Sequence, residues 1–302
     1  MTVASGVSPA TTDQMIGVLA ALASAAAWAV GSILYKRLGE KVQALSMNLV
    51  KNVLSLAILL VVLLASGVQA PGLAVFGALA LSGVLGIAVG DTLFFQALQE
   101  LGAHVLVLLC TLGQVATVLI AVLFLGERPT WEGWLGIALV IGGVAIVLDS
   151  QRSSEGGSLN LRGVARGLAA VLCMSSAIVL AKAAMASVTA IEATVFRTLG
   201  GVAGLALWGT FRGGLQGSVA PFRSLALTRE LVAAVLVSSL GGFWLFHVAL
   251  KHIDVATAST LNSTEPLFVL PLAAVFLKER VTRQAVVGAL VSVSGIVILS
   301  AR

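Results

Sequence analysis

The chain has 302 residues, of which 59% are hydrophobic and 10% are charged. Soluble globular domains carry about 25% charged residues, so this composition excludes an ordinary soluble protein. A membrane-spanning helix needs roughly 20 apolar residues, and about ten such helices fit a chain of this length with short connections. The net charge of +5 comes from few residues at the ends of apolar segments. It therefore bears on membrane topology and lipid head groups and does not indicate a nucleic-acid partner.

Residues 1–14 form a polar tail without lysine or arginine. A secretory signal peptide begins with a basic region, so we expect the first apolar segment to be retained as a helix. A second polar stretch, residues 149–163, is rich in Ser, Gly and charge and is typical of an exposed linker. The predicted units are thus the tail, a first membrane unit at residues 15–148, the linker, and a second membrane unit at residues 164–302.

The apolar segments within these units predict five transmembrane helices in each. In the first unit they are Met15–Tyr35, Met47–Ser66, Leu73–Leu98, Ala103–Leu125 and Trp131–Leu148. In the second unit they are Val164–Ala184, Ala190–Phe211, Leu231–Leu250, Val255–Leu277 and Gln284–Ser300.

The two units repeat one another. The stretch Phe124–Leu148 returns as Phe276–Ser300 at an offset of 152 residues, with the same charged turn between two apolar segments. This offset holds from Gly90 onward, and an offset of 146 pairs earlier positions, including Lys51 with Arg197. Because five is an odd number of spans, the second unit must enter the membrane from the opposite side. The predicted fold is an all-α integral membrane protein of ten transmembrane helices, arranged as two inverted five-helix repeats around a central cavity.

The basic residues of the loops are unequally divided between the two sides of the membrane. Four lie on the side of the N-terminus: Arg128, Lys182, Lys251 and Arg302. Twelve lie on the other side: Lys36, Arg37, Lys41, Arg152, Arg162, Arg166, Arg212, Arg223, Arg229, Lys278, Arg280 and Arg283. Because basic loops tend to stay in the cytoplasm, this division places both termini outside.

Three motifs give the chain a resemblance to a known family. They are the GER and KER turns after the fourth and ninth spans, the run GDTLFFQALQELGA at Gly90–Ala103, and the run STEPLF at Ser263–Phe268. Their order and doubling resemble the EamA type of the drug/metabolite transporter superfamily. The resemblance implies ten helices, a central cavity, and export or exchange of small metabolites by alternating access.

The chain departs from this family in two respects. Gly113-Gln114 stands in the first repeat where the second repeat has Glu265-Pro266, so the fourth span lacks a proline that is common there. Bacterial members of the family usually keep both termini in the cytoplasm, which is the reverse of what the charge count predicts.

Glu265 is the sharpest candidate for a site residue. It lies near the middle of the ninth span, where an ionised acid costs about 2.5–3.5 kcal/mol on insertion scales. Pro266 follows it and removes a helical hydrogen bond to the carbonyl of Asn262. Asn262 and Glu265 share a helical face, which predicts a polar, locally broken wall of the cavity. The alternative is a protonated or hydrogen-bonded glutamate at a helix kink.

The second span carries a polar stripe at the spacing of one helix face: Asn48, Lys51, Asn52 and Ser55. A matching stripe in the second repeat contains Arg197, about 10 Å from its helix end. Polar stripes in both repeats predict cavity lining and binding of an anion or carboxylate. For Lys51, about 6 Å from its helix end, the alternative is snorkelling toward the head groups.

Asp91 lies in the third span, about 7–8 Å beyond its centre. Three roles are open to it: binding a substrate amine, carrying a coupling proton, or pairing with a cation such as Arg197. Further candidates for lining the cavity are Trp28, Gln96, Gln114, Phe243 and His247, for which ordinary packing is the alternative. The charged turns at Glu127 and Glu279 are expected to stabilise helix ends.

The sequence contains no Walker A, HExxH, paired CxxC, GxSxG or GxGxxG motif. Its three histidines are too few and wrongly spaced for a typical zinc site. We therefore predict neither an enzyme nor a bound cofactor or metal, and uphill transport would be driven by an ion gradient or by exchange.

The sequence thus predicts a secondary active transporter, an exporter or exchanger, for small polar metabolites such as amino acids or related zwitterions and carboxylates. The expected partners are that substrate, protons as the coupling ion, and the lipid bilayer. The expected location is the inner membrane of a bacterium, as a monomer or homodimer. One alternative is a flippase for a lipid-linked substrate, which needs a cavity open sideways to the bilayer. The other is an intramembrane enzyme, which needs a catalytic constellation on facing helices.

Overall fold

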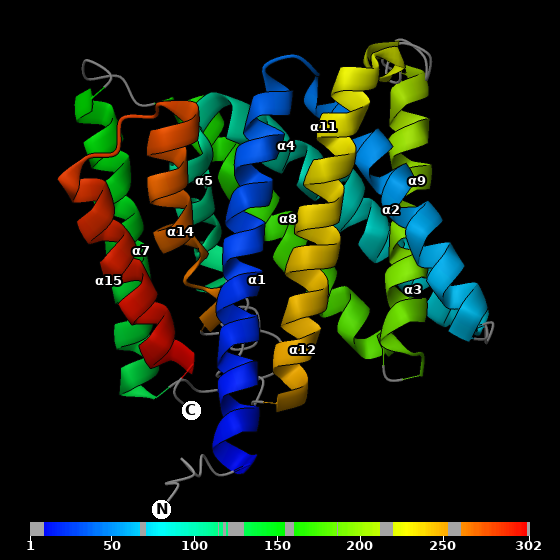
Figure 1. Cartoon of the computed structure of the whole chain (residues 1–302), viewed down its shortest axis with the longest axis horizontal. Helices are drawn as coiled ribbons and strands as arrows, with labels where there is room; N and C mark the ends of the chain where they lie inside the picture. Colours follow the sequence, from blue (N-terminus) through cyan, green and yellow to red (C-terminus); the bar gives the residue numbers. More distant parts are fainter. Residues whose placement is uncertain are drawn as a thin grey trace, which may run out of the picture.

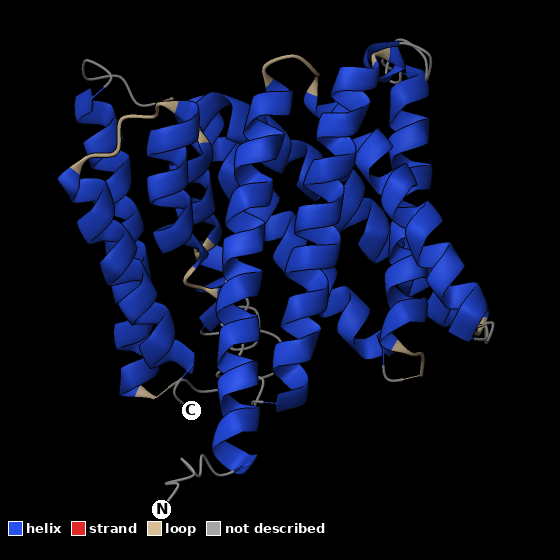
Figure 2. Ribbon diagram, viewed as in Figure 1, coloured by secondary structure: helices blue, strands red, loops and turns tan. Residues whose placement is uncertain are grey.

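The computed structural model describes residues 9–66, 71–113, 115–116, 119, 130–154, 160–185, 187–211, 220–252 and 261–300. All regular structure among these residues is helical (Figure 2). They form ten helical rods. Five helices are long and apolar enough to cross a bilayer by themselves: Gln14–Gly39, Ala44–Ala65, Leu73–Leu101, Trp131–Ser150 and Leu161–Ala181.

The first repeat contains α1 (Pro9–Gly39), α2 (Ala44–Ser66), a third rod of three consecutive segments, α5 (Ala103–Cys110) and α7 (Trp131–Ser154). The third rod joins α3 (Leu73–Gly83), the π-helix η1 (Val84–Asp91) and α4 (Thr92–Leu101).

The second repeat contains α8 (Leu161–Met185) and α9 (Ala190–Phe211), then a short 3₁₀ turn, η2 (Ala220–Arg223). Its third rod joins α11 (Leu225–Val235), the π-helix η3 (Leu236–Trp244) and α12 (Leu245–His252). The last two rods are α14 (Glu265–Leu272) with the π-helix η4 (Ala273–Leu277), and α15 (Arg283–Ser300).

Several helices extend beyond their apolar stretches. The linker predicted at residues 149–163 is shorter than expected, because α7 continues to Ser154 and α8 already begins at Leu161. Ser150 in this segment is 2% exposed and its hydroxyl bonds that of Thr282, so this part of the segment is not an exposed linker. Polar residues at a span's end can continue the helix into the head-group region, where composition alone marks them as loop.

The two repeats run in opposite directions, as expected of inverted repeats (Figure 1). Helix α1 runs upward in this view and α8, which opens the second repeat, runs downward; α7 and α15 are opposed in the same way. Helix α1 begins and α15 ends at the lower end. The π-helices η1 and η3 contain the repeat mates Gly90 and Gly242, so the repeat extends to this irregularity of the backbone.

The fourth and ninth rods are interrupted at repeat-related positions. In the fourth, α5 ends at Cys110 and Thr111 makes a turn in which its backbone N–H and its hydroxyl both donate to the carbonyl of Leu108. In the ninth, Ser263 and Thr264 form a turn before α14 begins at Glu265. Broken helices in both repeats are typical of transporters that bind substrate near the midplane.

Close helix contacts depend on small residues, because lipid offers little hydrophobic drive for association. Where α7 crosses α15, a Cβ added at Gly143 would lie 2.4 Å from the carbonyl oxygen of Gly288 and 2.3 Å from Oγ of Ser292. The two fifth helices therefore touch backbone to backbone across the two repeats.

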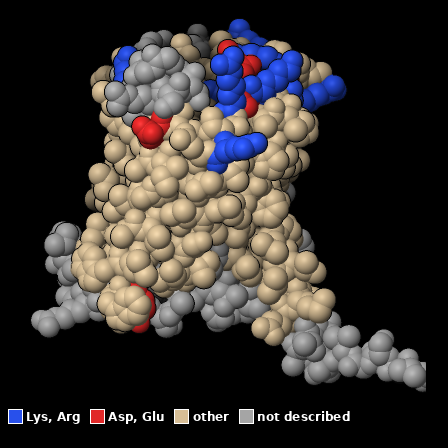
Figure 3. Space-filling view, turned by 90° about the vertical axis from the view of Figure 1, so that its left-hand side faces the viewer, with Lys and Arg blue, Asp and Glu red and all other residues tan. Residues whose placement is uncertain are grey.

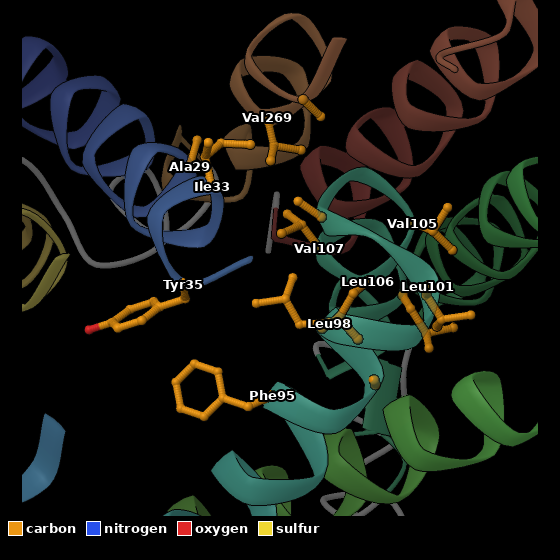
Figure 4. Close-up of a cluster of buried hydrophobic side chains, with 14 of the residues drawn as sticks. Ala29, Ile33, Tyr35, Phe95, Leu98, Leu101, Val105, Leu106, Val107 and Val269 are labelled. Atoms are coloured by element: carbon orange, nitrogen blue, oxygen red, sulfur yellow. The ribbon is translucent and has the colours of Figure 1, made fainter. Parts of the chain in front are cut away.

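Apolar side chains both fill the interior and cover the outside. A buried cluster lies among α1, α4, α5 and α14 (Figure 4). Its members include Ala29, Ile33, Tyr35, Phe95, Leu98, Leu101, Val105, Leu106, Val107 and Val269. On the face seen in Figure 3, a broad band without charged side chains lies below an upper end that is rich in lysine and arginine. This distribution fits a molecule that spans a bilayer.

The crossing of α7 and α15 leads to a first prediction. We expect Gly143→Ala to lower the free energy of unfolding by about 1–3 kcal/mol, because its methyl group would meet backbone atoms that cannot move aside locally. Thermal unfolding of the detergent-solubilised protein measures the change. The neighbouring Gly142→Ala is the control: its methyl group meets nothing within 4 Å, so equal losses in both variants would contradict this account.

Candidate functional site

A cavity of about 360 Å³ lies inside the helical bundle. It is bordered by α1, α2, η1, α4, α5, α8 and the start of α14, and therefore by both repeats. The lining residues are Trp28, Ser32, Tyr35, Lys51, Asp91, Phe94, Phe95, Val107, Cys110, Met174 and Glu265. Four of the candidates chosen from the sequence are in this set: Trp28, Lys51, Asp91 and Glu265.

The strongest polar contact of the cavity joins Lys51 to Asp91. Lys51 Nζ donates to Asp91 Oδ2 at 2.6 Å, and the two side chains are only 17% and 19% exposed. Nζ also lies 5.2 Å from the centre of the Phe95 ring. Lys51 therefore turns inward and does not snorkel, and the cation bonded to Asp91 is Lys51, not Arg197. Removing one partner of such a buried pair leaves an uncompensated charge.

Glu265 is placed by the break in the ninth rod. It stands in the first turn of α14, directly before Pro266, where the helix dipole favours a negative charge. Ser32 Oγ donates to Glu265 Oε1 at 3.3 Å. No lysine or arginine in the described part of the chain lies within 4.0 Å of this carboxylate. Glu265 is thus an acid in the cavity without a cationic partner there.

Aromatic rings form much of the remaining wall. Tyr35 packs edge-on against Phe95, with ring centres 5.1 Å apart. The Tyr35 hydroxyl lies 3.0 Å from Oγ of Ser238 on η3, and Ser238 in turn donates to the carbonyl of Ala234. Ser238 thus uses its only proton on the backbone, so Tyr35 donates to Ser238. This bond ties α1 of the first repeat to the eighth rod.

Asn48 and Asn52 have a different role from the one expected of the polar stripe. Asn48 is fully buried, and its amide donates to the carbonyl of Ile87 in η1 and to the hydroxyl of Thr92. Asn52 donates to the backbone and side-chain oxygens of Asn48. A change from α- to π-helical hydrogen bonding disturbs the pairing of carbonyls, so an added donor is useful there. Asn48 therefore holds the third rod next to Asp91, Asn52 orients Asn48, and neither is among the cavity-lining residues.

Arg197 lies on α9, beside the same π-helix. A Cβ added at Gly86 would be 3.7 Å from its Nη2, so the guanidinium lies against η1. The Nε atom of Arg197 is buried and has no hydrogen-bond partner among the described residues. Arg197 is not among the residues that line the cavity.

Two further candidates whose side chains the structure describes, Gln96 and Asn262, are not among the cavity-lining residues. Gln96 is half-buried on α4. Asn262 lies where Ser24 Oγ reaches its Oδ1 at 2.9 Å, between α1 and the ninth rod. Gln114 and the side chains of Phe243 and His247 lie outside the described residues.

Sequence reasoning missed several lining residues. Ser32 and Tyr35 follow Trp28 at i+4 and i+7, so all three share one face of α1. Tyr35 is also the chain's single tyrosine, a signal that could have directed attention to this face. Cys110 lines the cavity at the end of α5, directly before the turn of the fourth rod.

A second polar cluster, at the upper end of the molecule, joins the repeats. Glu279 Oε1 accepts the backbone N–H of Ala103 at 2.9 Å, and Oε2 lies 2.5 Å from Nδ1 of His104. The carboxylate thus caps the N-terminus of α5 from the other repeat. Gly102, with φ of 84°, leaves space for this carboxylate, because a Cβ at that position would lie 2.7 Å from Oε1 of Glu279. The turn at Glu127 lies outside the described residues.

The pKa of Glu279 reflects this cap. Burial alone raises the pKa of the carboxyl, but the hydrogen bonds from the His104 ring and from the backbone N–H groups of Ala103 and His104 outweigh burial. The net pKa lies below the ordinary value of 4.5. The folded state therefore favours the ionised carboxylate.

Inverted repeats, broken helices and a polar cavity within an apolar bundle define a class, the integral membrane transporters. This chain belongs to the EamA-like transporter family, whose sequence pattern matches residues 15–149 and 161–301. The family resemblance of the motifs and the fold of two five-helix repeats are thereby confirmed.

Two individual proteins illustrate this likeness. The "Uncharacterized transporter in sor 3'region" of Acidianus ambivalens is 32% identical over 82 residues, which span 26% of this chain and 32% of that relative. A solved structure described as "Crystal structure of protein" matches with a TM-score of 0.62 and 18% identity. It covers 97% of this chain and 96% of its own, a likeness of fold alone.

The cap on α5 leads to a second prediction. We expect Glu279→Gln to lower the free energy of unfolding at pH 7 by about 1–3 kcal/mol, since it removes charge-assisted hydrogen bonds to a helix N-terminus. Because the pKa of Glu279 is lowered in the folded state, the loss is fully present above about pH 4.5 and shrinks as the pH falls through the folded pKa. Denaturation curves at pH 7 and at lower pH measure this difference.

The control is Glu132→Gln, which removes an acid from an exposed position in the first turn of α7. We expect almost no loss of stability from it at either pH. A loss for Glu279→Gln that stayed constant well below pH 4.5 would contradict the assignment to this carboxylate.

Proposed function

We propose that this protein is a secondary active transporter, an exporter or exchanger, for small zwitterionic or carboxylate-bearing metabolites of amino-acid size, working by alternating access. The observation that carries the proposal is a cavity lined by three ionisable side chains, Lys51, Asp91 and Glu265. This cavity lies between the interrupted fourth and ninth helices, one from each repeat. Groups of this kind are expensive within a membrane and mark substrate and ion pathways.

The cavity has the dimensions and chemistry for such a substrate. Its volume of about 360 Å³ is at the small end of the range for ligand pockets, about 300–1,000 Å³. A substrate ammonium group would bind the carboxylate of Glu265, and a substrate carboxylate would compete with Asp91 for Lys51. The rings of Trp28 and Phe94 offer apolar surface for the rest of the molecule.

Glu265 also suits the role of a proton carrier. Its carboxylate has a serine hydroxyl as partner and no nearby cation in the described part of the chain, so gain of a proton breaks no ion pair. Protonation would remove the charge that holds a substrate ammonium group. Substrate and proton would then compete for one carboxylate, which couples their movements in opposite directions.

The location that fits this function is the inner membrane of a bacterium, as a monomer or homodimer. On the face seen in Figure 3 the lysine and arginine side chains gather at the upper end, and in Figure 1 α1 begins and α15 ends at the lower end. By the positive-inside rule, the upper end would face the cytoplasm and the termini would lie outside.

Transport in proteoliposomes tests the proposal. We expect a panel of labelled amino acids and related zwitterions to contain at least one substrate whose uptake depends on an imposed pH gradient. Glu265→Gln should lower its initial rate roughly tenfold or more, as expected for loss of a charged hydrogen-bond partner worth about 1.5–3 kcal/mol.

Glu132→Gln serves again as control, because it removes an acid of the same type remote from the cavity. Substrate uptake that is the same in wild type and Glu265→Gln, with and without the gradient, would overturn the assignment of Glu265. No uptake or exchange of any compound in the panel would overturn the proposed substrate class.

A further inference from the structure

Two cations of this protein are related by its internal symmetry, and both lie on helices that pack against the π-helix ending in the acid Asp91. Lys51 on α2 and Arg197 on α9 are repeat mates at the offset of 146 residues. Asp91 has no acidic mate, since the repeat places Phe243 at the corresponding position. Helices α2 and α9 both pack against η1, the π-helix that ends at Asp91.

The structure shows one of two pairings that this arrangement permits. Lys51 holds Asp91 Oδ2 at 2.6 Å. Arg197 and Asp91 form no ion pair within 4.0 Å, and the buried Nε of Arg197 lacks a hydrogen-bond partner among the described residues. The guanidinium nevertheless remains beside η1, with Nη2 next to Gly86.

The backbone keeps Arg197 within reach of this π-helix. A Cβ added at Gly83 would be 1.8 Å from the carbonyl oxygen of Arg197, and one added at Gly200 would be 2.3 Å from the carbonyl oxygen of Ala80. The third rod and α9 thus touch through their main chains immediately beside Arg197. The guanidinium of Arg197 is thus held against the helix that carries Asp91, whose carboxylate is bonded to Lys51. It is available as an alternative partner for that carboxylate.

We propose that Asp91 exchanges Lys51 for Arg197 when the transporter changes from the state seen here to the state open to the opposite side. This inference rests on the proposed function and makes Arg197 a positioning residue of the transport cycle. Lys51 and Arg197 stabilise alternative states by competing for one carboxylate.

Inverted repeats supply the reason for an exchange between symmetry mates. Each repeat has the same fold in opposite orientation, and alternating access is largely a rocking of one repeat against the other around a fixed site. Such a movement would change how α2 and α9, one from each repeat, lie against η1. A single acid between them then has two mutually exclusive partners, which makes the pair of contacts a two-state element.

Sided thiol labelling tests the exchange. Met174→Cys places a reporter on the cavity wall, in a chain whose Cys110 and Cys173 are replaced by alanine. A membrane-impermeant thiosulfonate reagent is added to one face or the other of oriented vesicles. The measured quantity is the ratio of the labelling rates from the two faces.

We expect Lys51→Met and Arg197→Met to shift this ratio of labelling rates in opposite directions. Each shift should be about fivefold or more, since about fivefold is the lower end of typical coupling between two sites. Removing Lys51 frees Asp91 for Arg197, and removing Arg197 fixes the state seen here. In an Asp91→Asn background the opposed shifts should vanish, because the shared carboxylate is gone.

Lys51→Arg keeps the charge and can engage both carboxylate oxygens, so it should shift the ratio in the same direction as Arg197→Met. If the Lys51→Met or Arg197→Met protein does not accumulate in the membrane, Lys51→Arg provides the test instead. Shifts in the same direction for Lys51→Met and Arg197→Met, or ratios within about twofold of the unsubstituted reporter, would overturn the exchange. A reporter labelled from one face only, with and without substrate, would instead contradict alternating access and the proposed function itself.

Discussion

The structure depends on one constraint, that backbone N–H and C=O groups inside a bilayer must find partners within the protein. Most of the chain meets it with uninterrupted helices. Where it departs from the α-helix, a side chain or a turn supplies the missing bond: the amide of Asn48 reaches the carbonyl of Ile87 in η1, and Thr111 bonds Leu108 where the fourth rod is interrupted. The departures cluster around the cavity, because irregular backbone at membrane depth is tolerated where it lines a cavity or is buried in protein.

The chemistry of the cavity lies where the two repeats differ. Their common features, the direction of the rods, the π-helices and the backbone contact at Gly143, form the scaffold. Glu265 occupies the position that Gly113 has in the first repeat, and Asp91 the position that Phe243 has in the second. Symmetry thus supplies two related five-helix frames, and substitutions that break the symmetry supply the acids of the cavity.

The sequence was sufficient for the fold and for part of the site. Hydrophobic segments located the rods, and the repeat with an odd number of spans predicted their inverted arrangement. Charges within apolar segments singled out Lys51, Asp91 and Glu265, because a group so costly to bury is rarely incidental. Their pairing could not be predicted, since the inward turn of Lys51 depends on how α2 packs against the third rod. The π-helices could not be predicted either. A change from i→i+4 to i→i+5 hydrogen bonding leaves no pattern in the sequence comparable to the periodicity of hydrophobic residues.

The π-helix before Asp91 has a mechanical consequence. Successive residues of an α-helix are turned by about 100° around its axis, and a π-helix is wound less tightly. A change of one residue in the length of η1 would rotate the start of α4 relative to α3. The amide of Asn48, which bonds Ile87 and Thr92 on either side of Asp91, therefore fixes the rotational setting of this helix, and η3 is the π-helical segment of the second repeat.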